Sequence, residues 1–180
     1  MMESLSRNTG TATRSESFSY LVMKSPVGAL KLVASDKGLV AVLWEYDDPN
    51  RVLVGNGNLR EDSRHPILVE AKRQLTDYFE GKCEKFNLAL DFQGTEFQKK
   101  VWRALVEIPF GETRSYGQIA KQIGNPKAVR AVGAANGKNP ISIIAPCHRV
   151  IGSNGKLVGF AGGLDAKAFL LALEGKELIR

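Results

Sequence analysis

One stretch of the sequence indicates the fold class: TEFQKKVWRALVEIPFGETRSYGQIAKQIGNPKAVRAVGAANG, residues 95–137. It contains the start and stop signals of three successive helices. Thr95 stands three residues before Gln98, and Ser115 stands three residues before Gln118. This spacing is the capping box, in which the two side chains bond to free backbone N–H groups at the start of a helix. The stretch therefore predicts a helical C-terminal half.

The second and third of these helices form a recognisable pair. The first helix carries an apolar face and is predicted to end before Pro109. The second is short and stops at Gly124. Asn125 is then expected to cap the third helix, with Pro126 in its first turn and a stop at Gly137. Two short helices joined by a tight Gly-Asn turn are typical of a helix-turn-helix, a DNA-binding motif.

The third helix is rich in small residues, and the segment around it is basic. Small residues allow close approach to whatever the helix faces, which is equally a property of tight helix packing. The formal net charge is +6, and residues 91–180 supply all of it, with 13 basic and 7 acidic residues. Such a concentration indicates a polyanionic partner, with nucleic acid first among the candidates; a solvated basic face is the alternative. The two features together favour contact with DNA.

The N-terminal half is predicted to be a small α/β unit with an antiparallel sheet. Apolar residues alternate in short runs separated by turn formers, which predicts a meander. Pro66 is expected to begin a helix that has an apolar stripe and ends at Gly81. The runs expected as strands are residues 18–23, 29–35, 39–46 and 86–92, and residues 47–64 are expected to be a surface loop.

These segments together predict an α+β fold with two domains. Residues 1–17 are expected to be a disordered tail, residues 18–92 the N-terminal α/β domain and residues 93–180 the helical C-terminal domain with the helix-turn-helix. Near the end of the chain, Asp165 is expected to cap a final helix that stops at Gly175.

Composition places the chain among globular proteins without a membrane segment. Hydrophobic residues make up 43% and charged residues 24%. No apolar run approaches the roughly 18–20 residues needed to span a bilayer, and the polar N-terminus lacks the apolar stretch of a secretory signal. Two cysteines in 180 residues provide no disulfide framework, so the expected compartment is the reducing cytoplasm.

Cys147 is the candidate nucleophile. It follows an apolar stretch and Pro146, and His148 and Arg149 come directly after it. A free thiol, with a pKa of about 8.5, is a weak nucleophile, and a neighbouring base or cation favours the reactive thiolate. A small buried structural cysteine is the alternative. A metal site is disfavoured, since the two cysteines and two histidines lack the usual ligand spacings.

The sequence PCHRV at residues 146–150 resembles the active-site signature of the O6-alkylguanine-DNA alkyltransferases, also called methylated-DNA–protein-cysteine methyltransferases. The resemblance extends over residues 94–175 and includes the helix-turn-helix pattern, Arg130, Asn139 and the sequence LALEG at residues 171–175. The preceding half matches the family's variable N-terminal domain only loosely. The resemblance implies direct-reversal DNA repair: a methyl or larger alkyl group passes irreversibly, in a single turnover, from O6 of guanine (or O4 of thymine) to the protein.

The resemblance assigns roles to five residues. Cys147 would accept the alkyl group. His148 would act as its base through a bound water, with Glu174 orienting the imidazole. Tyr116 would protonate the leaving guanine, and Asn139 would join the recognition helix to the active-site loop through hydrogen bonds. Without the resemblance, Glu174 is interpreted as a solvated residue, Tyr116 as a core aromatic and Asn139 as a turn former.

The same resemblance places the DNA contacts on the third helix and at the start of the second. Arg130 matches the arginine that enters the duplex where the target nucleotide has left; a phosphate contact is the alternative. Base flipping is required because a base inside the stack cannot present its O6 substituent to a buried thiol. Small residues suit an approach through the minor groove. Besides Arg130, the residues expected at the DNA are Ala128, Ala131, Gly133 and Ser115.

The substrate pocket is expected to include Val150, Phe160 and Ala161. Phe160 stands where most family members carry tyrosine, and Ala161 stands where some carry serine. The chain lacks the N-terminal Cys/His set of the zinc-bearing members, which argues against a structural metal. The resemblance implies no cofactor, because the damaged double-stranded DNA is itself the alkyl donor, and the expected active form is a monomer.

Two rival functions use parts of the same pattern. A non-catalytic protein that binds alkylated DNA would share the helix-turn-helix, but such proteins lack the cysteine of the signature, and Cys147 is present. A hydrolase with a Cys-His-Glu triad would turn over an acyl donor, and it would leave the helix-turn-helix unexplained.

Overall fold

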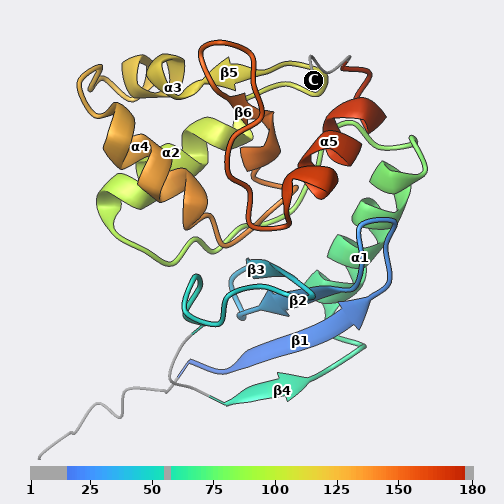
Figure 1. The fold of residues 1–180 in the computed structure, drawn as a ribbon. Coiled ribbons are helices and arrows are strands. Elements are labelled where there is room, and N and C mark those ends of the chain that lie inside the picture. The colour runs from blue at the N-terminus through green and yellow to red at the C-terminus, as the bar shows by residue number, and fades with distance from the viewer. Residues whose placement is uncertain (1–15, 55–57, 177–180) are drawn as a thin grey trace, which may run out of the picture.

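The alternating runs of the N-terminal half form a four-stranded sheet in the computed structural model, which describes residues 16–54 and 58–176. Neighbouring strands follow the order β3-β2-β1-β4 (Figure 1). β1 pairs antiparallel with β2, and β2 with β3, which confirms the predicted meander. The strands are β1 Phe18–Met23, β2 Leu30–Ala34, β3 Leu39–Trp44 and β4 Leu59–Glu61.

Residues 47–64, predicted to be a surface loop, contain the edge strand β4. This strand pairs parallel with β1, from Leu59 opposite Phe18 to Glu61 opposite Tyr20, so the sheet is mixed instead of purely antiparallel. All three residues of β4 are exposed. A strand without a buried face shows no hydrophobic alternation, and the sequence pattern therefore could not indicate it.

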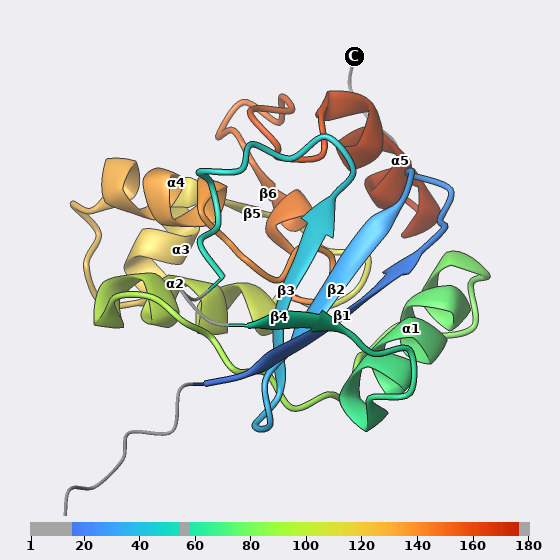
Figure 2. The ribbon, with the colours of Figure 1, turned by 90° about the horizontal axis from the view of Figure 1, so that it is seen from below.

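Helix α1, Pro66–Phe79, lies beside the sheet (Figure 2). Its apolar side chains share a hydrophobic cluster with those of the strands. Its predicted apolar stripe is present: Leu68, Ala71 and Leu75 are fully buried. They share one hydrophobic cluster with Leu32 of β2. Burying a large aliphatic side chain contributes on the order of 1.5–3 kcal/mol, so this contact holds the N-terminal half together.

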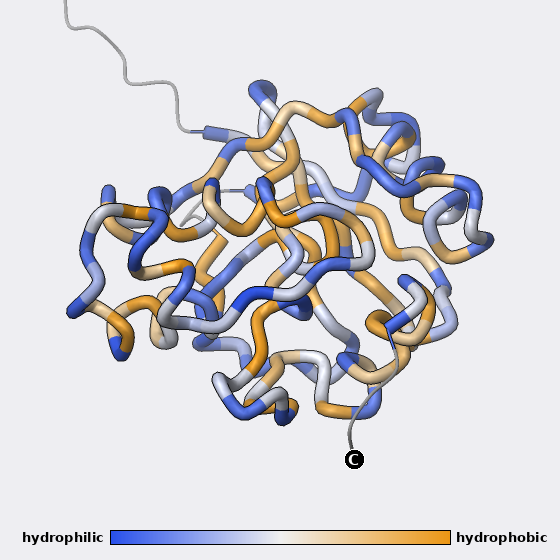
Figure 3. Tube along the Cα trace, turned by 90° about the horizontal axis from the view of Figure 1, so that it is seen from above, coloured by the Kyte–Doolittle hydropathy of each residue, from blue (hydrophilic) through white to orange (hydrophobic). Residues whose placement is uncertain are grey.

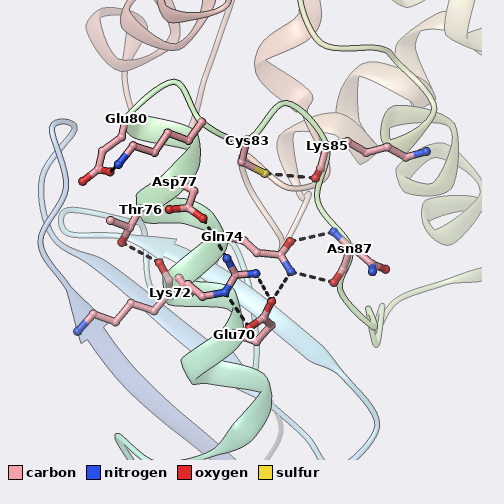
Figure 4. A network of polar contacts seen from close by, with 11 residues as sticks. Glu70, Lys72, Gln74, Thr76, Asp77, Glu80, Cys83, Lys85 and Asn87 are labelled. Atoms are coloured by element: carbon pink, nitrogen blue, oxygen red, sulfur yellow. Dashed lines mark hydrogen bonds and ion pairs between the residues drawn. The ribbon is translucent and has the colours of Figure 1, made fainter.

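Residues 86–92, predicted to be a further strand, do not form one. The buried side chain of Gln74 on α1 bonds to their backbone instead: Nε2 donates to the carbonyl of Asn87 at 3.0 Å, and Oε1 accepts from the N–H of Asn87 at 2.8 Å (Figure 4). Further along, the segment makes an isolated bridge between Leu90 and Leu39. Its apolar side chains still pack against the core. The alternation therefore indicated burial correctly but not sheet pairing.

Within residues 93–176, the C-terminal half contains four α-helices, one 3-10 turn and a short two-stranded sheet. Figures 1 and 2 show their arrangement. Both predicted capping boxes form: the N–H of Gln98 donates to Thr95 Oγ1, and the N–H of Gln118 donates to Ser115 Oγ, each at 3.1 Å. The helices are α2 Glu96–Val106, α3 Tyr116–Gln122, α4 Val129–Gly137 and α5 Leu164–Leu173, and the strands are β5 Arg114–Ser115 and β6 Val150–Ile151.

Helices α2, α3 and α4 pack on one another around a second hydrophobic cluster. Trp102 of α2 is buried there, and its indole Nε1 donates to the carbonyl of Ala135 on α4 at 2.8 Å. Figure 3 shows hydrophobic stretches running through the middle of the molecule, with many of the hydrophilic residues toward its rim. This packing fixes one side of α4 and leaves Arg130 exposed.

Two predicted helix starts are wrong. α4 begins at Val129 with Ala128 as its N-cap, because residues 125–128 form a turn in which the N–H of Ala128 donates to the carbonyl of Asn125. Asn125 therefore precedes the helix without capping it. α5 begins at Leu164 with Gly163 as its N-cap, and Asp165 lies inside the first turn, where its charge suits the positive end of the helix dipole.

The edge of β3 carries the segment that leads to Cys147. The N–H of Val42 donates to the carbonyl of Pro140 at 2.9 Å, and Trp44 Nε1 donates to Ser142 Oγ at 3.2 Å. The N-terminal sheet thus supports the backbone that precedes the cysteine.

The predicted disordered tail, residues 1–17, lies outside the described residues except for Glu16 and Ser17, which are exposed. Across residues 16–54 and 58–176, the model contains no helix with the length and apolarity that a bilayer span requires.

Candidate active site

Cys147 begins a single 3-10 turn, Cys147–Arg149, and only 4% of the residue is exposed. It lines a pocket of about 230 Å³. The pocket is built by the loop after β3, by α3 and α4, and by the segment before α5. Its lining includes Arg51, Tyr116, Gly133, Asn136, Phe160 and Ala161.

Glu174, the C-cap residue of α5, is buried next to the two residues that follow Cys147. His148 Nε2 lies 2.8 Å from Glu174 Oε1. Arg149 donates from Nε to Glu174 Oε2 at 2.9 Å and from Nη2 to Oε1 at 2.8 Å. Its Nη1 donates to the carbonyl of Ile108 at 2.6 Å. The structure therefore brings His148 and Glu174 together, with Arg149 as a further partner of the carboxylate.

Burial keeps the imidazole of His148 neutral, although an ionised carboxylate lies beside it. Burial by itself would raise the pKa of Glu174, but hydrogen bonds from His148 and Arg149 outweigh it and lower the pKa to about 2. An ionised carboxylate at Nε2 fixes the hydrogen of the imidazole on that nitrogen and leaves Nδ1 as the acceptor. Burial lowers the pKa of His148. Nδ1 is buried and has no hydrogen-bond partner in the part of the chain that is described.

Cys147 is a protonated thiol at rest, because burial raises its pKa. A hydrogen bond from Asn139 and the charges of Arg51 and Lys167 oppose this effect. Arg149, expected from the sequence to favour the thiolate, is instead neutralised by its ion pair with Glu174. A thiol in this state needs a base before it can attack a carbon atom.

Lys167 on α5 is buried and ties two parts of the pocket wall together. Its Nζ donates to the carbonyl of Val150 at 2.6 Å and to the carbonyl of Val158 at 2.9 Å. Burial lowers the pKa of Lys167 to about 8. Val150 was predicted to line the pocket, but its side chain lies in the second hydrophobic cluster. Its carbonyl contributes to the site by accepting the hydrogen bond from Lys167.

Asn139 is fully buried and links the end of α4 to the segment before Cys147. Its Nδ2 donates to the carbonyl of Ala145 at 2.8 Å, and its Oδ1 accepts from the N–H of Ile141 at 3.1 Å. The carbonyl of Asn139 accepts from Arg51 Nη1 at 2.7 Å. Arg51 is held in turn by Asp47, to which its Nε and Nη2 donate at 2.6 Å each.

Tyr116, Phe160 and Ala161 lie where a base could meet the thiol. Tyr116, the first residue of α3, is half-buried, and burial raises its pKa, so its hydroxyl remains a hydrogen-bond donor. Phe160 packs edge-on against Trp44, with ring centroids 5.3 Å apart. These contacts make part of the pocket wall apolar and rigid.

The residues predicted to contact DNA lie on and around α4. Arg130 and Ala131 are exposed, whereas Ala128 and Gly133 are half-buried. Ala131 and Gly133 line an open hollow beside α4. Ser115, the remaining member, uses its hydroxyl as the N-cap of α3. The site thus has an accessible face rich in small residues next to the Cys147 pocket.

Three residues at the site, Arg51, Asn136 and Lys167, were not selected from the sequence. Arg51 comes from the predicted surface loop, and Asn136 is buried at the pocket with Oδ1 lacking a partner within the described residues. No local pattern marks either. Lys167 did carry a signal, because it shares one helical face with Leu170 and Glu174, and a charged residue at a core-facing position is unusual.

A metal centre has no ready ligand set here. Among residues 16–54 and 58–176, no three or more His, Cys, Asp or Glu side chains are grouped so that they could hold an ion.

Comparison with known proteins adds an independent line of evidence. The family model described as 6-O-methylguanine DNA methyltransferase, DNA binding domain, matches residues 96–176, and the ribonuclease-like domain of the same name matches residues 19–92. A methylated-DNA–protein-cysteine methyltransferase of Methanosarcina acetivorans is 52% identical over 156 residues, which cover 87% of this chain and 97% of the relative. One of Mycobacterium bovis is 61% identical over 157 residues, covering 86% and 91%. The crystal structure of Mycobacterium tuberculosis OGT in complex with DNA has a TM-score of 0.77 at 44% identity, covering 88% of this chain and 92% of that one.

Proposed function

This chain belongs to the 6-O-methylguanine DNA methyltransferase family, and we propose how its residues carry out the family's reaction. Its activity is direct-reversal DNA repair, in which an alkyl group passes from methylated DNA to a cysteine of the protein itself. One observation carries the residue assignment. The buried Cys147 thiol lines a small pocket, and the residue after it is a neutral histidine held by an ionised Glu174.

Activation of the thiol is the first step. The proton leaves Cys147 Sγ and reaches His148 Nδ1 through a bridging water, while Nε2–H stays bonded to Glu174. The positive charge that develops on the imidazole is stabilised by the carboxylate. Arg51 and Lys167 stabilise the thiolate, since both charges oppose the effect of burial on the thiol pKa.

Alkyl transfer follows in one displacement. The S–C bond forms as the bond between the alkyl carbon and O6 breaks, and the electron pair passes into the guanine ring. Tyr116 donates its proton to the guanine, and the proton held by His148 is returned to Tyr116 through solvent. Thiol and O6-alkylguanine therefore become thioether and guanine. A thioether has no easy hydrolytic route back to a thiol, so each molecule reacts once.

Access to the buried thiol requires base flipping. Arg130 is exposed on α4 near the pocket-lining Gly133, and its insertion into the duplex would offset part of the cost of unstacking the target nucleotide. Ala128, Ala131 and Gly133 would allow the helix to approach the groove closely. α3 and α4, with the turn between them, would act as the helix-turn-helix.

The substrate, on this proposal, is double-stranded DNA that contains O6-alkylguanine, with O4-alkylthymine as a second lesion. The DNA-bound crystal structure of the Mycobacterium tuberculosis relative supports DNA as the partner. We further propose a monomer that acts in the cytoplasm without a cofactor, and a domain boundary between residues 92 and 93. The separate matches of the two family models, to residues 19–92 and 96–176, support that boundary.

The pH dependence of a His148→Gln variant tests the proton path. With single-turnover kinetics and a labelled methyl group, the variant should transfer more slowly than wild type near neutral pH, by about 100-fold or more. The deficit should shrink as the pH rises through the pKa of the thiol, because hydroxide then removes the proton. A deficit that is constant over the whole pH range would show that His148 does not act as the base.

The alternative of a non-catalytic lesion binder is not favoured, since Cys147 is present at the pocket. A Cys147→Ala variant should still bind alkylated DNA and should take up no methyl group, whereas a pure binder would behave identically with and without the cysteine.

A further inference from the structure

Tyr78 reaches from the N-terminal half into the cluster that serves Cys147. Its hydroxyl donates to Glu174 Oε1 at 2.7 Å, across 96 positions of the sequence. Helices α1 and α5, which lead to these two residues, lie side by side in both ribbon views (Figures 1 and 2). Tyr78 is fully buried. The contact is therefore part of the folded core and not a surface coincidence.

The phenol of Tyr78 keeps its proton and donates it to the hydrogen bond with Glu174. Burial strongly raises the pKa of Tyr78, and the nearby negative charge of Glu174 raises it further. The ring is fixed by neighbouring aromatic side chains, with centroid distances of 5.5 Å to Phe79, 5.4 Å to Phe86 and 6.3 Å to Phe110. The hydroxyl therefore stays protonated and is held toward the ionised carboxylate of Glu174.

Glu174 Oε1 accepts from three side chains at once. His148 Nε2 lies at 2.8 Å, Arg149 Nη2 at 2.8 Å and the Tyr78 hydroxyl at 2.7 Å. Arg149 and Tyr78 each draw charge from this oxygen, so each weakens the stabilisation that Glu174 gives to a protonated His148. Tyr78 is the member of this set that the N-terminal half supplies.

We propose that Tyr78 is a positioning residue for alkyl transfer: its hydroxyl holds Glu174 Oε1 toward His148 and shares the charge of that oxygen, so that His148 stays neutral and able to accept the thiol proton. This inference rests on the proposed function of His148. It gives the N-terminal half a second part in the chemistry, beside that of Arg51, although that half contains none of the residues identified from the sequence motif.

The charged groups around His148 differ in their effect on its pKa, but each is held in place by hydrogen bonds. Arg149 and Lys167 both disfavour the imidazolium, and Glu174 favours it. Arg149 is fixed by Glu174 and by the carbonyl of Ile108, and Lys167 is fixed by two backbone carbonyls. Removing the Tyr78 hydroxyl changes none of these charges. It should leave Oε1 more basic toward His148 and thereby raise the pKa of the imidazole.

The test is a Tyr78→Phe variant, which keeps the buried ring and removes only the hydroxyl. The chain has two histidines, His65 and His148, so the imidazole NMR signals of His148 can be followed through a pH titration. We expect the titration midpoint of His148 to rise, and the acid limb of the methyl-transfer profile to rise with it. Near pH 6, transfer should slow about 3- to 10-fold, the scale of one ordinary hydrogen bond. At high pH the rates should converge.

Phe86→Leu is the matched control, because it loosens the same aromatic cluster and leaves the hydroxyl in place. It should shift neither the His148 titration nor the acid limb. An unchanged midpoint in Tyr78→Phe, or an equal shift in Phe86→Leu, would overturn the proposal. Failure of the proposed function is distinguishable from both results, since wild-type protein would then take up no methyl group on Cys147 at any pH.

Discussion

Phe160 shows how a single residue sets the chemistry of the pocket wall. Its ring lines the Cys147 pocket and packs edge-on against Trp44. A tyrosine at this position could donate its hydroxyl to an edge of the flipped guanine, whereas phenylalanine keeps the wall and lacks the donor. We therefore predict that Phe160→Tyr speeds methyl transfer from O6-methylguanine about 2- to 12-fold, the value of one neutral hydrogen bond.

Second-order rates on two lesions check this prediction. The gain should be smaller on O4-methylthymine, because the pyrimidine edge does not extend as far into the pocket. If the guanine rate is unchanged or lower, Phe160 serves only in packing.

Among the helices, α4 joins the surface that we propose to contact DNA to the Cys147 pocket. Arg130 is exposed on α4, while Gly133 of the same helix lines the Cys147 pocket. We predict that Arg130→Ala slows repair of duplex DNA much more than reaction with free O6-benzylguanine, because only the duplex requires extrusion of a nucleotide. Parallel rate measurements on the two substrates decide it. Equal losses would place Arg130 in thiol activation instead.

The start of α3 is capped by a side chain and the start of α4 is not, so mutations at the two positions should differ in their effect on stability. Ser115 Oγ accepts from the N–H of Gln118, whereas Asn125 makes no cap to α4. Ser115→Ala should therefore lower the free energy of unfolding by about 1 kcal/mol, the usual cost of losing a cap. Asn125→Ala should lower it by less than about 0.5 kcal/mol, as expected for a surface change. Urea unfolding measures both, and equal losses would contradict the cap assignment.

The elements that the sequence predicts well are those with a local signal. The capping boxes at Thr95 and Ser115 set the starts of α2 and α3 correctly, and the apolar stripe of α1 is where the periodicity places it. Residues 86–92 were wrongly predicted to be a strand, because the side chain of Gln74 bonds to their backbone at Asn87. β4 has no buried face. In each case the deciding contact comes from another part of the chain.

The same distinction holds for the site. Cys147 and His148 were selected from the sequence PCHRV, and Glu174 was selected from the sequence LALEG that the family shares. The structure places His148 beside Glu174. Tyr78 and Arg51 could not be found this way, because their own surroundings in the sequence are an ordinary amphipathic helix and a polar loop. Only the packing of the N-terminal half against the active-site segment reveals them.

At the scale of the whole molecule, the buried cluster around Glu174 couples stability to pH. The pKa of Glu174 is lowered to about 2 in the folded protein, from 4.5 in a free side chain. Below pH 4.5 the unfolded state binds a proton that the folded state does not, so this contribution is present above pH 4.5 and is lost as the pH falls toward 2. Burial also lowers the pKa of His148 in the folded protein. Below the ordinary pKa of histidine, the unfolded state therefore gains a proton that the folded state does not, and the stability of the fold decreases further as the pH falls.

We therefore predict the behaviour of Glu174→Gln. At neutral pH the variant should be about 3 kcal/mol less stable, because it leaves the buried Arg149 without its carboxylate. The difference from wild type should shrink as the pH falls below 4.5, where the wild-type carboxylate begins to lose its advantage. Urea unfolding at several pH values measures this. A difference that is independent of pH would mean that Glu174 contributes shape and not charge.

We propose that each molecule accepts one alkyl group, on Cys147. The intact mass of the protein after incubation with excess duplex that contains O6-methylguanine tests this. We expect a mass increase of a single methyl in place of one hydrogen, mapped to the peptide with Cys147. Cys83 should be unmodified, and Cys147→Ala should show no increase. More than one methyl transferred per protein molecule, or an unchanged mass while the lesion disappears, would contradict this proposal.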